Sequence, residues 1–199
     1  MKIEPIILEG ECVRLEPLSI EHLDGLCEIG FDESIWRWTM ALVRTKSDMR
    51  RYIETALDEQ ERGVSLPFAT IEKSAGKVIG STRFGSIDTK NRRAEIGWTW
   101  INPKWQRTAI NTEAKLLMLK HAFEVWKCIR VELKTDVLNE KSRNAILRIG
   151  AKQEGIFRQH LITEAGRFRD TVYFSIIDTE WEAVKTSLLL KLKESFRFQ

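Results

Sequence analysis

The stretch AEIGWTWINPKWQRTAINTEAKLLMLKHAFE, residues 94–124, decides the fold because its periodicity changes half-way along. Its first part belongs to an alternating run at 92–101, which predicts a β-strand that Pro103 ends. Its second part predicts a helix over 111–126, because apolar residues recur there at helical spacing. Those residues are Ala114, Leu117, Met118, Ala122 and Val125.

A further strand is predicted at 129–137, and the strand–helix–strand unit that it completes should form a right-handed parallel crossover. The other elements follow from weaker patterns of alternation, capping and turn residues. Ser19 and either Thr45 or Ser47 are the expected caps. Strands are predicted at 12–18, 66–73, 77–88, 151–161 and 168–177, helices at 21–30, 45–62, 141–149 and 180–192, and a loop or short helix at 34–40.

The resulting order is β-α-α-β-β-β-α-β-α-β-β-α, and no linker or internal repeat divides it. This order predicts a single α+β domain over residues 1–199. Its centre would be a mixed, mostly antiparallel sheet of about seven strands flanked by helices.

Composition narrows the class of protein. The chain is 43% hydrophobic and 31% charged, with a formal net charge of +3, which is ordinary for a globular protein. Basic and acidic residues alternate, which argues against nucleic-acid binding. There is no signal-peptide pattern and no apolar run of about 20 residues, so we expect a cytoplasmic protein without a membrane span. The three cysteines and three histidines are scattered, which predicts neither a disulfide framework nor a metal site.

The junction between the strand at 92–101 and the helix that follows is chemically suited to an anion. A helix that begins directly after a strand presents unpaired N–H groups and the positive end of its dipole. Phosphates bind at such ends, and Arg107, Thr108 and Thr112 add a positive charge and hydroxyl donors. Most strand–loop–helix junctions bind nothing, so this pattern alone is a weak signal.

A resemblance to a known protein family strengthens the case for an anion-binding site at this junction. The quoted stretch, the run RVELKTDVLNEKSRNAILRIGAKQEGIFRQH at 130–160 and the run GRFRDTVYFSIIDTEW at 166–181 together resemble the GNAT acetyltransferase superfamily. The chain is most similar to the ribosomal-protein N-terminal acetyltransferase-like (RimJ/RimL type) branch. The resemblance covers most of the chain and is most specific over 94–181. It implies a GNAT-like fold, acetyl-coenzyme A as co-substrate, an amine acceptor such as a protein N-terminus, and a homodimer, for which the sequence itself indicates no interface.

The resemblance also implies where the coenzyme lies, in a V-shaped gap between the strands at 92–101 and 129–137. The backbones of Trp100, Ile101 and Asn102 would pair with the pantetheine amides. The pyrophosphate would be wrapped by Gln106, Arg107, Thr108, Ala109, Ile110 and Asn111, with Thr112 at the helix start. Ala109 and Asn111 stand where this family usually has glycine, and the Cβ of Ala109 would lie where the backbone must approach phosphate.

Glu95 is the first candidate for the general base that takes the proton of the attacking amine. On an alternating strand Glu95 would share a face with Gly97, Thr99 and Ile101. In the family an acid on this strand often serves this role through water. The alternative is a surface carboxylate paired with Arg92 or Arg93.

The motif NEKS follows the second strand of the gap. The resemblance gives Asn139 a coenzyme contact and Ser142 the role of a donor to the departing thiolate, because Ile146 stands where many relatives have tyrosine. The alternative is structural, with Asn139 as a helix N-cap and Ser142 at its N3 position. Asn144 and Arg148 match further coenzyme-contacting positions.

Candidates for the acceptor side come from the early helical region and two strands. They are Trp36, Trp38, Arg83, Phe84 and either Arg169 or Asp170. The tryptophans could line an apolar or cation-binding pocket, or could attach the helices to the sheet, which we favour. An acid such as Asp170 would suit a cationic amine.

These observations predict an acetyl-CoA-dependent N-acetyltransferase that acts on a primary amine, either a protein N-terminus or a small molecule, without a metal. The alternative is a non-catalytic acyl-CoA-binding regulatory module of the same fold. That alternative is favoured by Ala109, by Asn111 and by the absent tyrosine. Fold alone cannot choose the acceptor.

Overall fold

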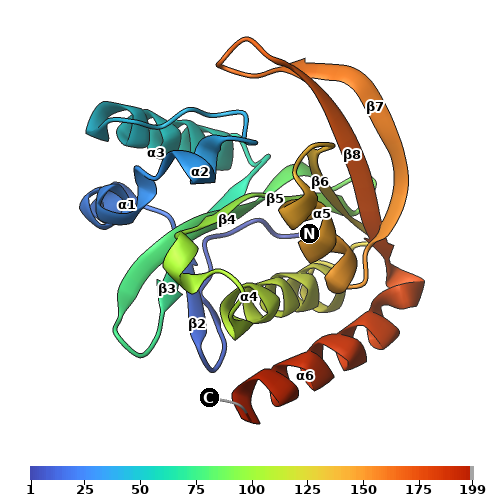
Figure 1. Ribbon diagram of the computed structural model, residues 1–199. Helices are drawn as coiled ribbons and strands as arrows, with labels where there is room; N and C mark the ends of the chain where they lie inside the picture. Colours follow the sequence, from blue (N-terminus) through green and yellow to red (C-terminus); the bar gives the residue numbers. More distant parts are fainter. Residues whose placement is uncertain (198–199) are drawn as a thin grey trace.

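The computed structural model describes residues 1–197, which form one curved sheet covered by helices (Figure 1). The strands are β1 (Leu8–Glu9), β2 (Val13–Pro17), β3 (Leu66–Glu72), β4 (Lys77–Asp88), β5 (Arg93–Ile101), β6 (Arg130–Asp136), β7 (Lys152–Ile162) and β8 (Phe168–Ile177). They form an eight-stranded sheet in the order β1-β2-β3-β4-β5-β6-β8-β7. The pair β5–β6 is parallel and the other neighbouring pairs are antiparallel.

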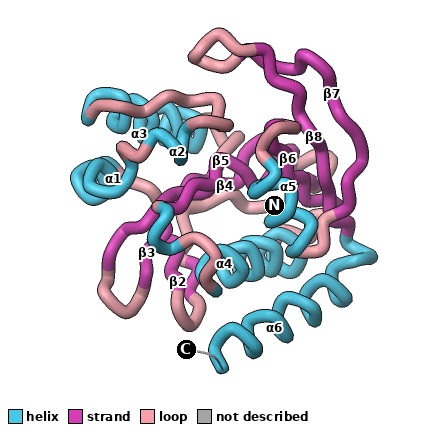
Figure 2. Tube along the Cα trace, viewed as in Figure 1, coloured by secondary structure: helices cyan, strands magenta, loops and turns pink. Residues whose placement is uncertain are grey.

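The helices divide between the two faces of this sheet (Figure 2). They are α1 (Leu23–Gly30), α2 (Glu33–Trp36), α3 (Lys46–Glu61), α4 (Ala109–Lys120), α5 (Glu140–Arg148) and α6 (Trp181–Arg197), with short turns η1 (Ile20–His22), η2 (Pro103–Trp105), η3 (His121–Val125) and η4 (Asp178–Glu180). The first three helices share a smaller core with Trp100 of β5. A larger core holds the apolar residues of α4, α5 and α6 against the opposite face.

The predicted α+β class and mixed sheet are confirmed, and the predicted elements lie within a few residues of those observed. The sequence pattern missed β1, because a strand of two residues shows no alternation. The predicted helix over 111–126 is really α4 from Ala109, followed by the π-helical turn η3. Within it, Val125 was expected on the apolar face but is 64% exposed.

Helix α4 is buried nearly all round, because the sheet covers one side of it and α6 covers the other. One consequence is a buried acid, Glu113, which is 4% exposed. Its carboxylate accepts hydrogen bonds from the backbone N–H groups of Glu11, Cys12 and Val13, at 2.7, 2.8 and 2.9 Å. Charge-assisted bonds of this kind are stronger than neutral ones, so Glu113 fixes the β1–β2 turn to α4.

Candidate functional site

The parallel pair β5–β6 separates soon after it begins. The two strands are paired only where Arg93–Glu95 lies beside Arg130–Glu132. Beyond Glu95 the strand β5 keeps β4 as its neighbour but loses β6. Trp98 is therefore 37% exposed and Thr99 is exposed, although both lie in a central strand. This is where the family resemblance implied a V-shaped gap.

A bulge on β5 changes which side chains face which helices. The register with β4 shifts between Ser81 and Arg83, and Trp98 takes a left-handed φ of 47°. A bulge inserts a residue and reverses the alternation beyond it. The expectation that Glu95 shares a face with Thr99 and Ile101 is therefore wrong. Ile101 lies in the α4-side core, whereas Glu95 lies on the opposite face, with Lys134.

The loop before α4 has the form of an anion-binding helix start. The side chain of Thr108 caps α4, accepting from the N–H of Ile110 at 3.4 Å and donating to the carbonyl of Trp105 at 2.8 Å. The left-handed residue of the loop is Arg107, with φ of 62°. The two positions where relatives have glycine, Ala109 and Asn111, are the first and third residues of the helix.

The absence of glycine at Ala109 and Asn111 does not prevent a phosphate from binding at this helix start. Neither Ala109 nor Asn111 has a positive φ, so neither needs glycine for its backbone conformation. The methyl group of Ala109 is 3% exposed and belongs to the hydrophobic core, so it does not occupy the approach to the N–H groups. The residues present therefore fit a pyrophosphate.

The remaining residues predicted to contact the coenzyme lie at the end of β5 and in the loop after it, and they make contacts within the protein. Trp100 and Ile101 are buried and paired with β4 along one edge. The side chain of Asn102 donates to the carbonyl of Ile29 at 2.8 Å and accepts from the N–H of Lys104 at 3.1 Å. Gln106 donates to the carbonyl of Ile101 at 2.9 Å. The side chains of Asn102 and Gln106 thus fix the loop.

Glu95 is buried, not a surface carboxylate, since its exposed fraction is 2%. Its partner is Lys134 on β6, at 2.8 Å, rather than Arg92 or Arg93. Ser86 donates a further hydrogen bond to it at 3.2 Å. Burial alone lowers the pKa of Lys134, but the attraction of Glu95 outweighs it and the pKa of Lys134 is raised.

Asn139 and Ser142 lie at the start of α5, as the structural alternative predicted. Asn139 caps the helix by accepting from the N–H of Ser142 at 3.1 Å. The hydroxyl of Ser142 is half-buried. Ile146, where relatives have tyrosine, is buried in the core, and Asn144 is exposed.

Arg148, the last residue of α5, lies beside α6. Its side chain is exposed, and its backbone carbonyl accepts a hydrogen bond from Lys191 of α6 at 2.5 Å.

Two of the acceptor candidates are packed into the protein. Trp36 is 3% exposed, donates to the carbonyl of Gly30 at 2.6 Å and packs against Trp100 at 5.3 Å between ring centroids. It attaches α2 to the sheet, as favoured from the sequence. Phe84 is fully buried in the α4-side core, so it offers no surface to a substrate.

Arg83 and Trp38 lie on the side of the sheet that carries α1–α3. Arg83 is buried, pairs with Glu59 at 2.9 Å and lies 4.7 Å from the ring centroid of the exposed Trp98. Trp38 is half-buried and stacks with Arg167 at 5.4 Å. Asp170 accepts from the N–H of Gln159 at 2.6 Å and so supports a bend in β7.

The tip of the β7–β8 hairpin reaches across to the loop after α2 (Figure 1). The N–H of Glu164 donates to the carbonyl of Met40 at 3.3 Å, and the carboxylate of Glu164 accepts from the N–H of Leu42 at 2.7 Å. These hydrogen bonds join the loop after α2 to the β7–β8 hairpin.

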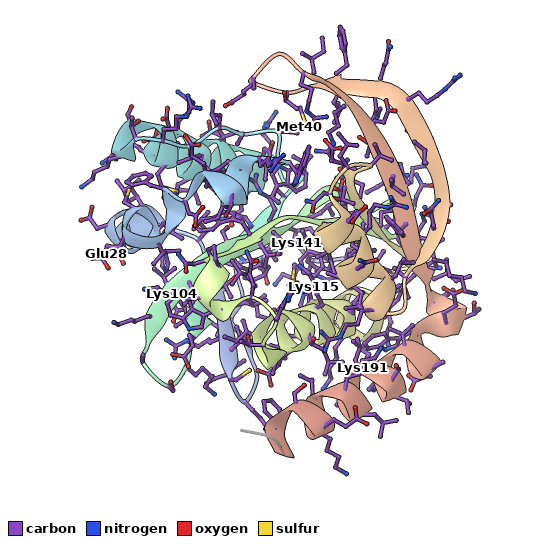
Figure 3. The ribbon with its side chains drawn as sticks, in the orientation of Figure 1. Glu28, Met40, Lys104, Lys115, Lys141 and Lys191 are labelled. Carbon is purple, nitrogen blue, oxygen red and sulfur yellow. The ribbon has the colours of Figure 1, made fainter. Side chains whose placement is uncertain are left out.

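Sequence reasoning missed Lys115, which lies in the middle of the molecule (Figure 3). It is 5% exposed, and its ammonium donates to the hydroxyls of Thr82 at 3.1 Å and of Thr99 at 2.7 Å. Burial lowers the pKa of Lys115 to about 7. A signal was available, because Lys115 precedes the fully buried Met118 and Leu119 at helical spacing.

Within residues 1–197 no group of three or more His, Cys, Asp or Glu side chains is arranged to hold a metal ion. None of the helices in that part of the chain has the length and apolar character needed to cross a membrane.

Known proteins resemble this chain along most of its length. A family profile described as "Acetyltransferase (GNAT) domain" matches residues 13–152. The chain is 32% identical over 174 residues to "Putative ribosomal N-acetyltransferase YdaF" of Bacillus subtilis (strain 168), covering 86% of this chain and 92% of that protein.

Solved structures of acetyltransferases are also similar to this chain. A GCN5-related N-acetyltransferase from Brucella melitensis matches with a TM-score of 0.88 and 35% identity, over 95% of this chain and 86% of that one. Mycobacterium smegmatis RimJ in complex with CoA-disulfide matches with a TM-score of 0.78 over 94% of this chain and 92% of that one. At 20% identity the latter likeness concerns the fold alone.

Proposed function

This chain belongs to the GNAT acetyltransferase family and is an N-acyltransferase; from that premise we propose that it transfers the acetyl group of acetyl-CoA to a primary amine by direct attack in a ternary complex. The acceptor is a protein N-terminus or a small-molecule amine. The observation that carries the proposal is the early separation of β5 from β6 beside the capped start of α4.

The coenzyme side of the site is the α4 side. The N-terminal N–H groups of α4, with Arg107 and Thr108, hold the pyrophosphate because they combine free donors with positive charge. The edge of β5 that has lost β6 offers backbone groups to the pantetheine amides. Acetyl-CoA supplies an activated acyl group with a thiolate as the leaving group.

The groups that assist transfer come from both faces of the sheet. Glu95, whose charge is balanced by Lys134, accepts the proton that the amine releases, directly or through a water. Ser142 donates to the departing sulfur. Lys115, held beneath the exposed Thr99, places a hydrogen-bond donor near the developing negative charge. Holding the two substrates in line supplies much of the remaining rate enhancement.

The non-catalytic alternative loses one of its supports. It rested partly on Ala109 and Asn111, and both residues are helical, without positive φ. Catalysis by the intact site is therefore the function that these residues support best.

A matched pair of variants tests the coenzyme site. Thr108→Asp and Thr108→Asn both keep a side chain that caps a helix, but only aspartate adds negative charge at the phosphate position. By calorimetry we expect wild type and the Asn variant to bind acetyl-CoA similarly. The Asp variant should bind at least about tenfold more weakly.

The two parts of the proposal fail differently. If wild type binds no acetyl-CoA at saturating ligand, the enzymatic function is wrong. If the Asp and Asn variants bind equally well, the assignment of the phosphate site is wrong, although turnover can persist. Thiol release with an amine panel then tests transfer, and Glu95→Gln should lower kcat without weakening coenzyme binding.

A further inference from the structure

Three buried polar atoms on the last two strands have no hydrogen-bond partner in the described part of the chain. They are Nε of Arg169 and Oγ1 of Thr171, on β8, and Nδ1 of His160, on β7. Arg169 is 6% exposed and Thr171 is fully buried. Buried polar atoms are almost always paired, so three orphans on neighbouring strands require an explanation.

The three side chains lie on the same face of the sheet as Glu95. On β8 the alternate residues Val172 and Phe174 enter the α4-side core, so Arg169, Thr171 and Tyr173 face the other way. The His160 ring lies 5.7 Å from the ring of Tyr173, which also stacks on Lys134, the partner of Glu95. The orphan atoms thus lie next to the proposed base, on the acceptor side.

The charges of this face are unbalanced at Arg169. The two nearby carboxylates already have partners, because Glu95 is paired with Lys134 and Asp136 with Arg167. Burial lowers the pKa of Arg169 even though both carboxylates attract it. A guanidinium nevertheless stays charged in proteins, and its buried Nε has no hydrogen-bond partner in the described part of the chain. An anion delivered from outside would supply the missing partner.

The chemistry of the three groups selects a carboxylate. A guanidinium presents a planar fork of donors that matches carboxylate oxygens. The Thr171 hydroxyl adds a donor. Burial, with Lys134 and Arg169 nearby, lowers the pKa of His160, which therefore remains neutral and donates from one ring nitrogen.

We propose that Arg169, Thr171 and His160 bind the carboxylate of the acceptor, so that the substrate is an amine that also carries a carboxylate. This inference rests on the proposed function and deepens it by naming the class of acceptor. The carboxylate comes either from the α-carboxylate of an amino acid or from an acidic side chain near a peptide N-terminus. In both cases the amine points toward Glu95 while the acid is held at β8.

Paired acceptors test the proposal. Amino acids are compared with their amides, and short peptides with glutamate at the second position are compared with the glutamine versions. The first pair detects an α-carboxylate and the second an acidic side chain. For wild type we expect kcat/KM to be at least about tenfold higher for the carboxylate-bearing member of one pair.

The variant Arg169→Gln should abolish that preference. It should raise the KM for the acidic acceptor and leave the KM for the matching amide acceptor unchanged. Arg158→Gln, on the exposed surface of β7, makes the same change of net charge and should leave the preference intact. Thr171→Val provides a second variant if Arg169→Gln folds poorly. Unaltered acetyl-CoA binding by calorimetry shows that each variant is folded.

Equal kcat/KM within both pairs would overturn the inference while leaving the proposed transferase activity intact. If no amine is acetylated, the proposed function fails, and carboxylate binding is then measured without turnover. Propionate, but not propionamide, should raise the Tm of wild type and not that of Arg169→Gln. Identical Tm changes in the two proteins would refute the carboxylate site.

Discussion

A buried lysine and a half-buried lysine, on opposite faces of the sheet, have pKa values shifted in opposite directions. Lys115, on the α4 side, donates hydrogen bonds to the hydroxyls of Thr82 and Thr99, and burial lowers its pKa to about 7. Lys134, on the opposite side, is paired with Glu95, and its pKa is raised. Desolvation acts on both, so the presence of a carboxylate decides the direction.

The difference separates the two halves of the proposed site. On the coenzyme side, the buried ammonium of Lys115 is hydrogen-bonded to two hydroxyls. The acceptor side holds a network of acids and bases in which Arg169 has no ion-pair partner among the described residues. A thioester needs few charges, whereas an amine that must lose a proton and be oriented needs several.

The largest expected effect on stability comes from breaking the ion pair between Glu95 and Lys134. Lys134→Met leaves Glu95 buried and unpaired, so the free energy of unfolding should fall by about 3–5 kcal/mol in urea denaturation. The double variant Glu95→Gln with Lys134→Met should recover most of this loss, because both charges are gone. A single variant as stable as wild type would mean that the pair contributes nothing.

The pH dependence of that loss follows from the raised pKa of Lys134. A raised folded pKa gives stability that is complete below the ordinary value of 10.5 and is lost as pH rises through the folded value. The deficit of Lys134→Met should therefore be constant between neutral pH and that value.

The second prediction has the opposite sign. Lys115→Met removes a buried charge and leaves no orphan hydroxyl, because Thr82 and Thr99 also bond each other at 2.7 Å. The variant should be more stable than wild type at pH 6–7, by at most about 5 kcal/mol. Urea denaturation of both proteins at several pH values measures the difference.

The sign of its pH dependence can be worked out from the lowered pKa. Lys115 has a folded pKa of about 7 and an ordinary value of 10.5. The unfolded chain binds the extra proton between these values, so wild-type stability rises with pH across that window. The advantage of the variant should shrink from pH 7 to pH 10.5. A gap that is independent of pH would show that Lys115 is not desolvated.

The smallest effect tests the loop before α4. Ala109→Gly restores the glycine common in relatives, but Ala109 is helical and its methyl group is in the core. We expect stability to fall by about 1 kcal/mol and acetyl-CoA affinity to change by less than about threefold. A large gain in affinity, measured by calorimetry, would show that the Cβ does obstruct phosphate.

Much of the fold was predictable because its signals are local. Alternation and helical spacing gave the order of strands and helices, apart from β1. Capping was predictable too: Ser19, Thr45 and Asn139 occupy N-cap positions, since a cap depends on residues two or three positions away. The strand–loop–helix junction was located for the same reason.

The site was only partly predictable. The two interpretations of Glu95, a buried base or a surface carboxylate, stayed open in the sequence; the structure buries the side chain, and a bulge and a neighbouring strand decide its face and its partner. Phe84 was placed near a substrate although it lies in the core. Lys115 and the orphan atoms of β7 and β8 were not identified as a group, because each depends on groups far away in sequence.

The sequence by itself determined the class of fold, the junction before α4 and the family, because these depend on short-range periodicity and on motifs in order. Only the tertiary structure decided which buried charges have partners. Whether Lys115, Lys134 or Arg169 meets a carboxylate depends on strand register and on the bulge at Trp98. Those contacts join residues distant in the chain, and desolvation makes their free energy large.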